Sequence, residues 1–389
     1  MRKTGPVRGS SRIAGIDVVR GAVMVLMALD HVRDYVTELR FTPENLARGS
    51  AALFATRWVT HFCAPAFFLL AGLGIGISRQ RGAPGGGLSR YLVVRGLWLL
   101  VLELVITPIG WRFSFDLLPA FALVLWALGW SMILMAAFIH VPTRVLAALS
   151  LAVIAGHNAF DAIQPQSLGR FAGLWIVLHG PGFAIPNVLL IGYPLVPWIA
   201  VMALGYTLAV FYQRDSARRR RYLMALGTGA VLLFVALRAF NAYGNTFPWT
   251  VQRTSALTVA SFLNLRKYPP SLQFLLMTLG PTFIALALAE RARGAFARRL
   301  SVYGRVPLFF YVVHIFVAHA LAVLLAFVQS GEWRRIPIIT APESLPDWYG
   351  VGLPGVYGAW MIVVLLLYFP CRWFARLKET RTDWWLRYL

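Results

Sequence analysis

Charged residues are scarce in this sequence, and acidic ones especially so. Of its 389 residues, 13% are charged and only 15 are Asp or Glu, whereas 59% are hydrophobic. Soluble domains usually carry about a quarter of their residues as charged ones, and one of this size could not bury so much apolar side chain. The composition therefore excludes a soluble globular protein and favours an integral membrane protein.

Several familiar signatures are also missing. The two cysteines, Cys63 and Cys371, are expected to lie far apart in the membrane, so no disulfide is predicted. The seven histidines form no H-E-x-x-H or comparable ligand motif, and no metal site is predicted. Walker, Rossmann and G-x-S-x-G motifs are absent as well. Gly72, Gly74 and Gly76 fit none of these and are expected to allow close packing of helices.

Long apolar runs dominate what is present, and runs of about 20 residues predict helices that cross a bilayer. We expect an all-α bundle of about ten such helices, forming a single domain over residues 1–389. The segment 164–187 is left open as an interfacial element, a re-entrant element or an eleventh helix. The ten predicted ranges are 13–36, 58–77, 91–109, 117–139, 145–160, 188–211, 222–240, 272–289, 306–328 and 356–374.

The basic residues predict how this bundle is oriented. With ten helices, the basic tail 1–12, the run 218–221, the arginines of 291–305 and the tail 375–389 all fall on one side of the membrane. Because basic loops are retained in the cytoplasm, both termini are predicted there. The N-terminus lacks a small-residue cleavage site, so no cleaved signal peptide is expected. The net charge of +22 is thereby explained without a nucleic-acid partner; the expected partners include membrane lipids, and the oligomeric state is left open.

A polar stripe follows one face of the first predicted helix. Ionisable side chains inside a bilayer are costly and indicate a functional site by default. Arg20 and His31 are eleven residues apart, about 16 Å along a helix axis, so the cation would lie near the cytoplasm and the histidine, beside Asp30, deeper. A local pair of Asp17 with Arg20 that only fixes the helix end is the alternative. The stripe, at steps of three and four residues, consists of Asp17, Arg20, Met24, Met27, His31 and Asp34.

Further ionisable residues are predicted in the central or outer half of other helices. His157 and Asp161 are one turn apart and are expected to pair. Arg95 joins Arg20 in the inner half. Cations are thus expected in the inner half, and acid–base groups in the central and outer half. This arrangement suits a phosphate-bearing donor that is anchored inside and extends its reactive end to a histidine acting as a base. The central and outer residues are His61, Glu103, His157, Asp161, Lys267, Tyr268, His314 and His319.

Five blocks of the sequence, spread in order along nearly the whole chain, resemble one known family. They are RIAGIDVVRGAVMVLMALDH (12–31), HFCAPAFFLLAG (61–72), YPLVPWIAVMALGY (193–206), LNLRKYPPSLQFLLMTLGP (263–281) and GRVPLFFYVVH (304–314). Together they resemble bacterial membrane proteins that are similar to heparan-α-glucosaminide N-acetyltransferase.

The resemblance implies a transmembrane acyltransferase in a bacterial inner membrane. Such a protein would take acetyl from cytosolic acetyl-CoA, a co-substrate rather than a tightly bound cofactor, and deliver it to a periplasmic or lipid-linked glycan. Related membrane acyltransferases have an arginine, ten residues and then a histidine in the first helix, and Arg20 and His31 match that spacing. The lysosomal enzyme places its histidine in the loop before the second helix, whereas segment 37–57 has none here. Either the role falls to His31, His61 or His314, or the bacterial branch uses a different chemistry.

These observations assign expected roles and leave two alternatives. His31 beside Asp30 would act as the base, and His61, His314 or Lys267 would stabilise the oxyanion. A transporter or flippase of a small anion or lipid-linked sugar is the first alternative, because buried charges and broken helices serve transport equally well. A non-catalytic membrane scaffold is the second. Donor binding is expected from Arg20, Asp17 and Arg95, with support from Lys267, Tyr268, His157, Asp161, Glu103 and His319.

Overall fold

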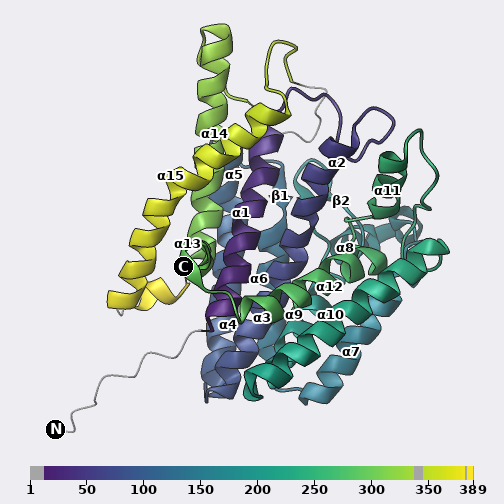
Figure 1. Cartoon of the computed structure of the whole chain (residues 1–389), viewed down its shortest axis with the longest axis vertical. Coiled ribbons are helices and arrows are strands. Elements are labelled where there is room, and N and C mark those ends of the chain that lie inside the picture. Colours follow the sequence, from purple (N-terminus) through teal and green to yellow (C-terminus); the bar gives the residue numbers. More distant parts are fainter. Residues whose placement is uncertain (1–12, 337–344, 382, 389) are drawn as a thin grey trace.

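The computed structural model describes residues 13–336, 345–381 and 383–388, and helices make up most of that part (Figure 1). The predicted N-terminal tail 1–12 lies outside the described residues. The α-helices are α1 Ala14–Val36, α2 Ala51–Trp58, α3 Cys63–Gln80, α4 Gly85–Val101, α5 Thr107–Arg112, α6 Val124–Phe138, α7 Thr143–Gly156, α8 Ala172–Leu178, α9 Trp198–Thr207, α10 Ser216–Ala239, α11 Ser255–Leu263, α12 Leu272–Ala289, α13 Gly294–Arg305, α14 Pro307–Ser330 and α15 Leu353–Thr380.

Tighter or wider turns extend several of these helices. The 3₁₀ segments are η1 Val59–Phe62, η3 His157–Phe160, η4 Pro165–Phe171, η5 Leu208–Gln213 and η7 Trp384–Tyr388, and a π-helical segment, η2, covers Leu102–Ile106. Through η1, α2 and α3 form one continuous stretch from Ala51 to Gln80. Three short strands, β1 Ala120–Ala122, β2 Gly182–Ile185 and β3 Leu189–Ile191, complete the described elements.

The lengths and apolar character of the helices support a multi-pass membrane protein. Seven helical stretches in the described residues are long and apolar enough to cross a bilayer. Helix α1 has 23 residues but is not among these, because its five Asp and Arg residues are spread along it and leave no 18-residue window with two or fewer of them. Helix α6 and the α9–η5 stretch are shorter apolar helices. Each predicted range thus contains a helix, whereas the number of crossings and the side of the termini stay predictions. The seven are Ala51–Gln80, Gly85–Arg112, Thr143–Phe160, Ser216–Ala239, Leu272–Ala289, Pro307–Ser330 and Leu353–Thr380.

Two predicted helices begin later than expected because their first residues form strands. The range 117–139 becomes helical only at Val124, and 188–211 only at Trp198. Strand β1 pairs with β3 in parallel, with Ala120 opposite Leu189, and β2 pairs with β3 antiparallel. The apolar residues of β1 and β3, which had predicted helix, instead pair as strands of this small sheet. Segment 164–187 forms η4, α8 and β2, so it is not an eleventh full-length helix.

Three helices were missed, and several predicted helices are longer than expected. Helix α2 lies almost entirely in segment 37–57, which was predicted as an outer loop. Helix α11 lies inside a predicted outer loop, and α13 lies where only a basic loop was predicted. Their short or strongly basic sequences lack the long apolar run on which the prediction relied. Helix α13 packs on α1, because the backbones of Gly21 and Gly304 each approach the other helix closely. Helix α15 continues past 374 to Thr380, so the predicted tail from 375 begins as helix.

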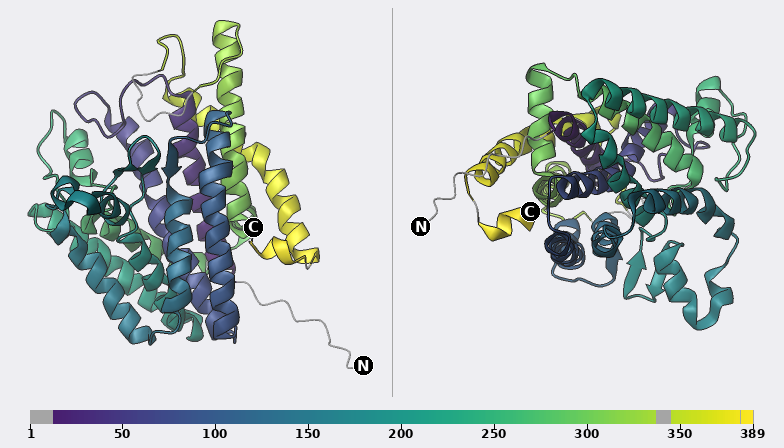
Figure 2. Two further views of the ribbon diagram at one scale, coloured as in Figure 1. Left: turned by 180° about the vertical axis from the view of Figure 1, so that it is seen from behind. Right: turned by 90° about the horizontal axis from the view of Figure 1, so that it is seen from below.

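Helix α1 occupies the middle of the bundle and contacts α3, α12, α13, α14 and α15. Figure 2 shows α15 at the margin of the bundle, with the C-terminal turn folding back toward it. There Tyr388 of η7 stacks on Tyr91 of α4, with ring centroids 5.5 Å apart. The polar face of α1 is therefore enclosed by protein, as the stripe predicted.

Two of the three predicted packing glycines lie at a close helix crossing. A Cβ added at Gly72 or Gly76 of α3 would overlap backbone oxygens of α9, at Met202 and Tyr206. Gly205 of α9 makes the reciprocal approach to α3. Gly74, in contrast, has open space where its Cβ would be. The prediction of close packing is confirmed for Gly72 and Gly76 and is wrong for Gly74.

We predict that Gly72→Ala destabilises the protein by about 1–3 kcal/mol, because the methyl group forces α3 and α9 apart. Gly74→Ala is the matched control on the same helix and should be neutral or slightly stabilising, since alanine favours helix by up to about 1 kcal/mol over glycine. Unfolding in detergent followed by tryptophan fluorescence measures both variants. Equal losses of stability would contradict the assignment of this crossing.

Candidate functional site

Two histidines from distant parts of the chain meet in the centre of the bundle. His31 of α1 and His314 of α14 approach with Nδ1 and Nε2 2.7 Å apart. The rings stack with centroids at 4.9 Å, and Trp111 packs edge-on against His31. His314 is fully buried, whereas His31 is partly accessible. Both were predicted site residues, and the structure brings them together.

The hydrogen bonds of this histidine pair fix which nitrogens carry protons. His314 Nδ1 lies 3.0 Å from the carbonyl oxygen of Phe310, which can only accept, so this nitrogen donates. In neutral His314 the Nε2 atom is therefore an acceptor, and its partner His31 Nδ1 must donate. The remaining nitrogen of neutral His31, Nε2, is left with a free lone pair. This is the state that a general base requires.

A cavity of about 460 Å³ opens at the Arg20 end of α1, and we call it the inner cavity. Arg20 donates to the Gly304 carbonyl at 3.2 Å and lies 3.5 Å from Asp17, so the expected local pair is present. Arg95 of α4 also lines this cavity. Arg305 and Lys378 add two further cations. Four positive side chains around one cavity favour an anionic ligand.

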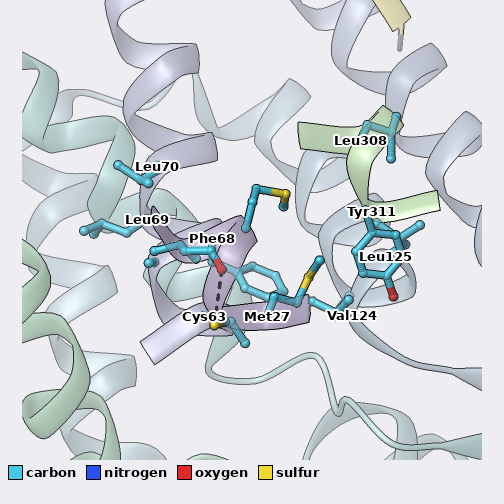
Figure 3. Packing of buried hydrophobic residues seen from close by; sticks show 14 of the residues in the cluster. Met27, Cys63, Phe68, Leu69, Leu70, Val124, Leu125, Leu308 and Tyr311 are labelled. Carbon is cyan, nitrogen blue, oxygen red and sulfur yellow. Dashed lines mark hydrogen bonds between the residues drawn. The ribbon is translucent and has the colours of Figure 1, made fainter. Parts of the chain in front are cut away.

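A much smaller space of about 30 Å³, the central cavity, lies deeper along α1. His31 and Lys267 line it, together with Thr60 and Asp30. Its walls are continuous with those of the inner cavity, because the two share Phe67, Val124 and Tyr311. Figure 3 shows Tyr311 beside Leu125 and Val124, with Met27 close by. Tyr311 thus stands between the cation-lined cavity and His31.

An outer cavity of about 380 Å³ lies beyond His31, at the far end of α1 from Arg20. Its lining combines paired charges with aromatic rings. Burial would raise the pKa of the Glu44 carboxyl, but the Arg57 guanidinium, 2.7 Å away, and His61 together outweigh it and hold that pKa well below its usual range. Glu44 is therefore ionised at neutral pH. The lining includes Arg33, Asp34, Phe41, Glu44, Arg57 and Tyr268.

Asp30 belongs to an ion-pair cluster rather than to the histidine pair. Its Oδ1 and Oδ2 accept from Arg57 Nη1 at 2.5 and 2.6 Å, and Oδ1 also accepts from Arg33 Nη2 at 2.5 Å. Thr60 Oγ1 donates to the same carboxylate at 2.8 Å. Asp30 takes the predicted position beside His31 in α1, but its hydrogen bonds go to Arg57, Arg33 and Thr60. Two arginines and a threonine take its acceptor positions. This cluster lies between two cavities, because Arg33 and Arg57 line the outer one and Asp30 and Thr60 line the central one.

Three other predicted residues lie away from the histidine pair. His61 is buried with Nε2 3.9 Å from Glu44 Oε1, and it is not among the described residues lining the central cavity. Glu103 accepts from the backbone N–H of Leu125 at 2.7 Å and so caps the start of α6. His319 Nδ1 donates to the Gly110 carbonyl at 2.9 Å. The contacts of Glu103 and His319 indicate structural roles, whereas both buried ring nitrogens of His61 have no hydrogen-bond partner among the described residues.

The predicted pairing of His157 with Asp161 is wrong. His157 Nε2 bonds to the Pro270 carbonyl at 2.8 Å, and its Nδ1 lies near carbonyls of its own helix. Asp161 accepts from His179 Nε2 at 3.0 Å and from Asn158. The chain changes to a 3₁₀ turn at His157, which has three residues per turn, so the i, i+4 alignment is lost.

Sequence reasoning missed four residues of the site. Arg57 was assigned to a loop, and its approach to Asp30 is a tertiary contact without a local signal. Arg33 and Tyr311 do have such a signal, since each is three residues from a predicted site residue, Asp30 or His314. The fourth missed residue is Thr60, next to the predicted His61.

Comparison with known proteins identifies the family. The sequence model described as heparan-alpha-glucosaminide N-acetyltransferase, catalytic, matches residues 12–243, more than half of the chain. The chain belongs to this family. The predicted resemblance is confirmed, and the family indicates an acetyltransferase. A search of curated proteins finds no match.

The range matched by the family model contains α1 and most of the cavity-lining residues on α2 to α6. His314 and Lys267 lie beyond the matched range. The site is therefore completed by α14 and by the segment before α12, which fold back onto α1 (Figure 1).

Proposed function

We propose that the protein transfers acetyl from acetyl-CoA, held in the inner cavity, to a hydroxyl or amine of a sugar that reaches His31 from the outer cavity. The main support for this proposal is the His31–His314 pair, with Nδ1 and Nε2 2.7 Å apart. The pair lies at the central cavity, which shares lining residues with the inner cavity. The membrane is a bacterial cytoplasmic membrane in this proposal, with the inner cavity facing the cytoplasm. Basic residues clustered toward that end support this orientation.

The proposed transfer needs one base and one group to stabilise the oxyanion. His31 Nε2 takes the proton of the acceptor as its oxygen or nitrogen attacks the thioester carbonyl. His314 accepts the His31 Nδ1–H bond throughout and so holds the ring of the resulting imidazolium in place. Lys267 lines the same cavity and supplies positive charge for the oxyanion. Collapse releases the CoA thiolate, which recovers the proton from His31.

The test is acetyl transfer by purified protein. The protein in detergent is incubated with radiolabelled acetyl-CoA, with and without a mixture of amino sugars and glycans. We expect labelled acetyl in the sugar fraction and free CoA in equal amount. A well-folded protein that leaves acetyl-CoA intact, yet moves a labelled anion or lipid-linked sugar across vesicle membranes, would establish the transporter instead.

We predict that Arg95→Gln raises the KM for acetyl-CoA by about tenfold with little change in kcat. The reason is that losing one charge-assisted hydrogen bond to a phosphate removes about 1.5–3 kcal/mol of binding, and about 1.4 kcal/mol is a factor of ten. Arg90→Gln, an exposed arginine on the same helix that is not among the described residues lining the inner cavity, is the matched control. An unchanged KM in Arg95→Gln would remove the inner cavity from donor binding.

A further inference from the structure

A fourth cavity, of about 740 Å³, lies near the inner cavity but on another side of α3. It is bounded by the end of α3, the start of α7, the α9–η5 stretch and Leu226 of α10. We call it the side cavity. On α3 the inner cavity is lined by Gly74, Ile75 and Ser78, whereas the side cavity is lined by Gly76, Arg79 and Gln80. The mechanism proposed above makes no use of this space.

The side cavity combines an apolar wall with a cationic rim. The wall comes from aliphatic and aromatic side chains, among them Leu204, Phe211 and Leu226. At the rim stand Arg79 of α3 and Arg144 of α7, both exposed. Within the described part of the chain, Arg144 makes neither a hydrogen bond nor an ion pair. An unpaired guanidinium above an apolar wall is complementary to a ligand with an anionic head and hydrocarbon chains.

The place of the cavity in the molecule indicates where such a ligand comes from. Gln213 lines it, and the chain then continues directly into Arg214 and the basic run of α10 from Arg218 to Arg221. This is a side predicted to face the cytoplasm. Basic pockets between transmembrane helices on that side suit the head groups of anionic lipids.

We propose that the side cavity binds an anionic phospholipid of the adjoining leaflet. Its phosphate lies between Arg79 and Arg144, and one acyl chain runs along Leu204, Phe211 and Leu226. The apolar wall distinguishes this ligand from a free phosphate ion, which the arginines alone would hold. The proposal does not depend on acetyl transfer, because the two sites have different lining residues.

The test is lipid retention measured by native mass spectrometry. Full-length protein in dodecyl maltoside is titrated with phosphatidylglycerol, with phosphatidylcholine and with inorganic phosphate. We expect one phosphatidylglycerol to bind with saturation and at least about tenfold more tightly than phosphatidylcholine. The double variant Arg79→Gln/Arg144→Gln should bind phosphatidylglycerol about a hundredfold more weakly, since each of its two lost charge-assisted contacts weakens binding by about tenfold.

The control variant Arg218→Gln/Arg221→Gln removes the same charge from the neighbouring basic run and should retain the bound lipid. A third variant, Leu226→Trp, fills the wall and should weaken lipid binding while both arginines stay in place. Equal losses in the double variant and its control would overturn the proposal in favour of non-specific attraction to the basic surface. Saturable binding of phosphate alone, unaffected by Leu226→Trp, would overturn it in favour of a simple anion site.

Discussion

Replacing His31 by alanine should lower the rate of acetyl transfer by about 10²–10⁴-fold, which is the range that a positioned general base contributes. Acetyl-CoA should still bind, because the cations of the inner cavity are untouched. The loss should therefore appear in kcat, with KM for the donor nearly unchanged. Single-turnover transfer of labelled acetyl, beside equilibrium binding of CoA, separates the two effects.

His314 is a positioning residue, because it acts on the reaction through its hydrogen bond to His31. His314→Gln keeps a side chain that can accept from His31 Nδ1, so it should lose less activity than His314→Ala. His319→Gln, on the same helix, is the matched control, because that histidine bonds to the Gly110 carbonyl instead. Full activity of His31→Ala would move the base to another residue. Equal losses in the His314 and His319 variants would show a general effect of packing in α14.

Arg57→Met should destabilise the folded protein by about 3 kcal/mol. Breaking a buried ion pair by removing one partner typically costs about 3–5 kcal/mol, because a charge is left uncompensated. The lower end applies here, since Asp30 keeps its bonds to Arg33 and Thr60, and Glu44, which also loses its arginine partner, is partly exposed to water. The midpoint of unfolding, as the mole fraction of SDS in mixed micelles rises, measures the change.

Two further variants show whether that loss comes from the ion pair. Arg48→Met removes an exposed arginine from the segment between α1 and α2 and should change stability by no more than about 0.5 kcal/mol. The double variant Asp30→Asn/Arg57→Met should lose less stability than the sum of its two single variants, because the charges are coupled. Additive losses would mean that Arg57 stabilises the fold by packing alone.

Most of the candidate site residues that could be predicted followed from the spacing of polar residues along single helices. Arg20 and His31 follow from helical periodicity and the scarcity of charge in the membrane, and the structure places one at the inner cavity and the other at the central cavity. His314 was predicted as a buried histidine of the ninth helix. Its contact with His31 was not, because 283 residues separate the two and periodicity says nothing about which helices face each other.

The predictions that failed concern contacts made where the backbone leaves regular α-helix, because helical periodicity does not apply there. Asp161 pairs with His179 because η3 ends the α-helix, and that break has no strong local signal. Asp30 turns to Arg57 because α2 and η1 bring that arginine back beside α1. The apolar strands β1 and β3 resembled helix because a short apolar run is ambiguous between the two.

The contact of Tyr388 with Tyr91 has a practical consequence for anyone who handles this protein. Tyr91 lines the inner cavity, so the last turn of the chain sits at the edge of the space proposed for acetyl-CoA. An affinity tag or fluorescent fusion joined shortly after Tyr388 would lie beside that edge and compete with the donor. A tag placed elsewhere, or one removed by protease before the assay, avoids a loss of activity that comes only from blocking the entrance to this cavity.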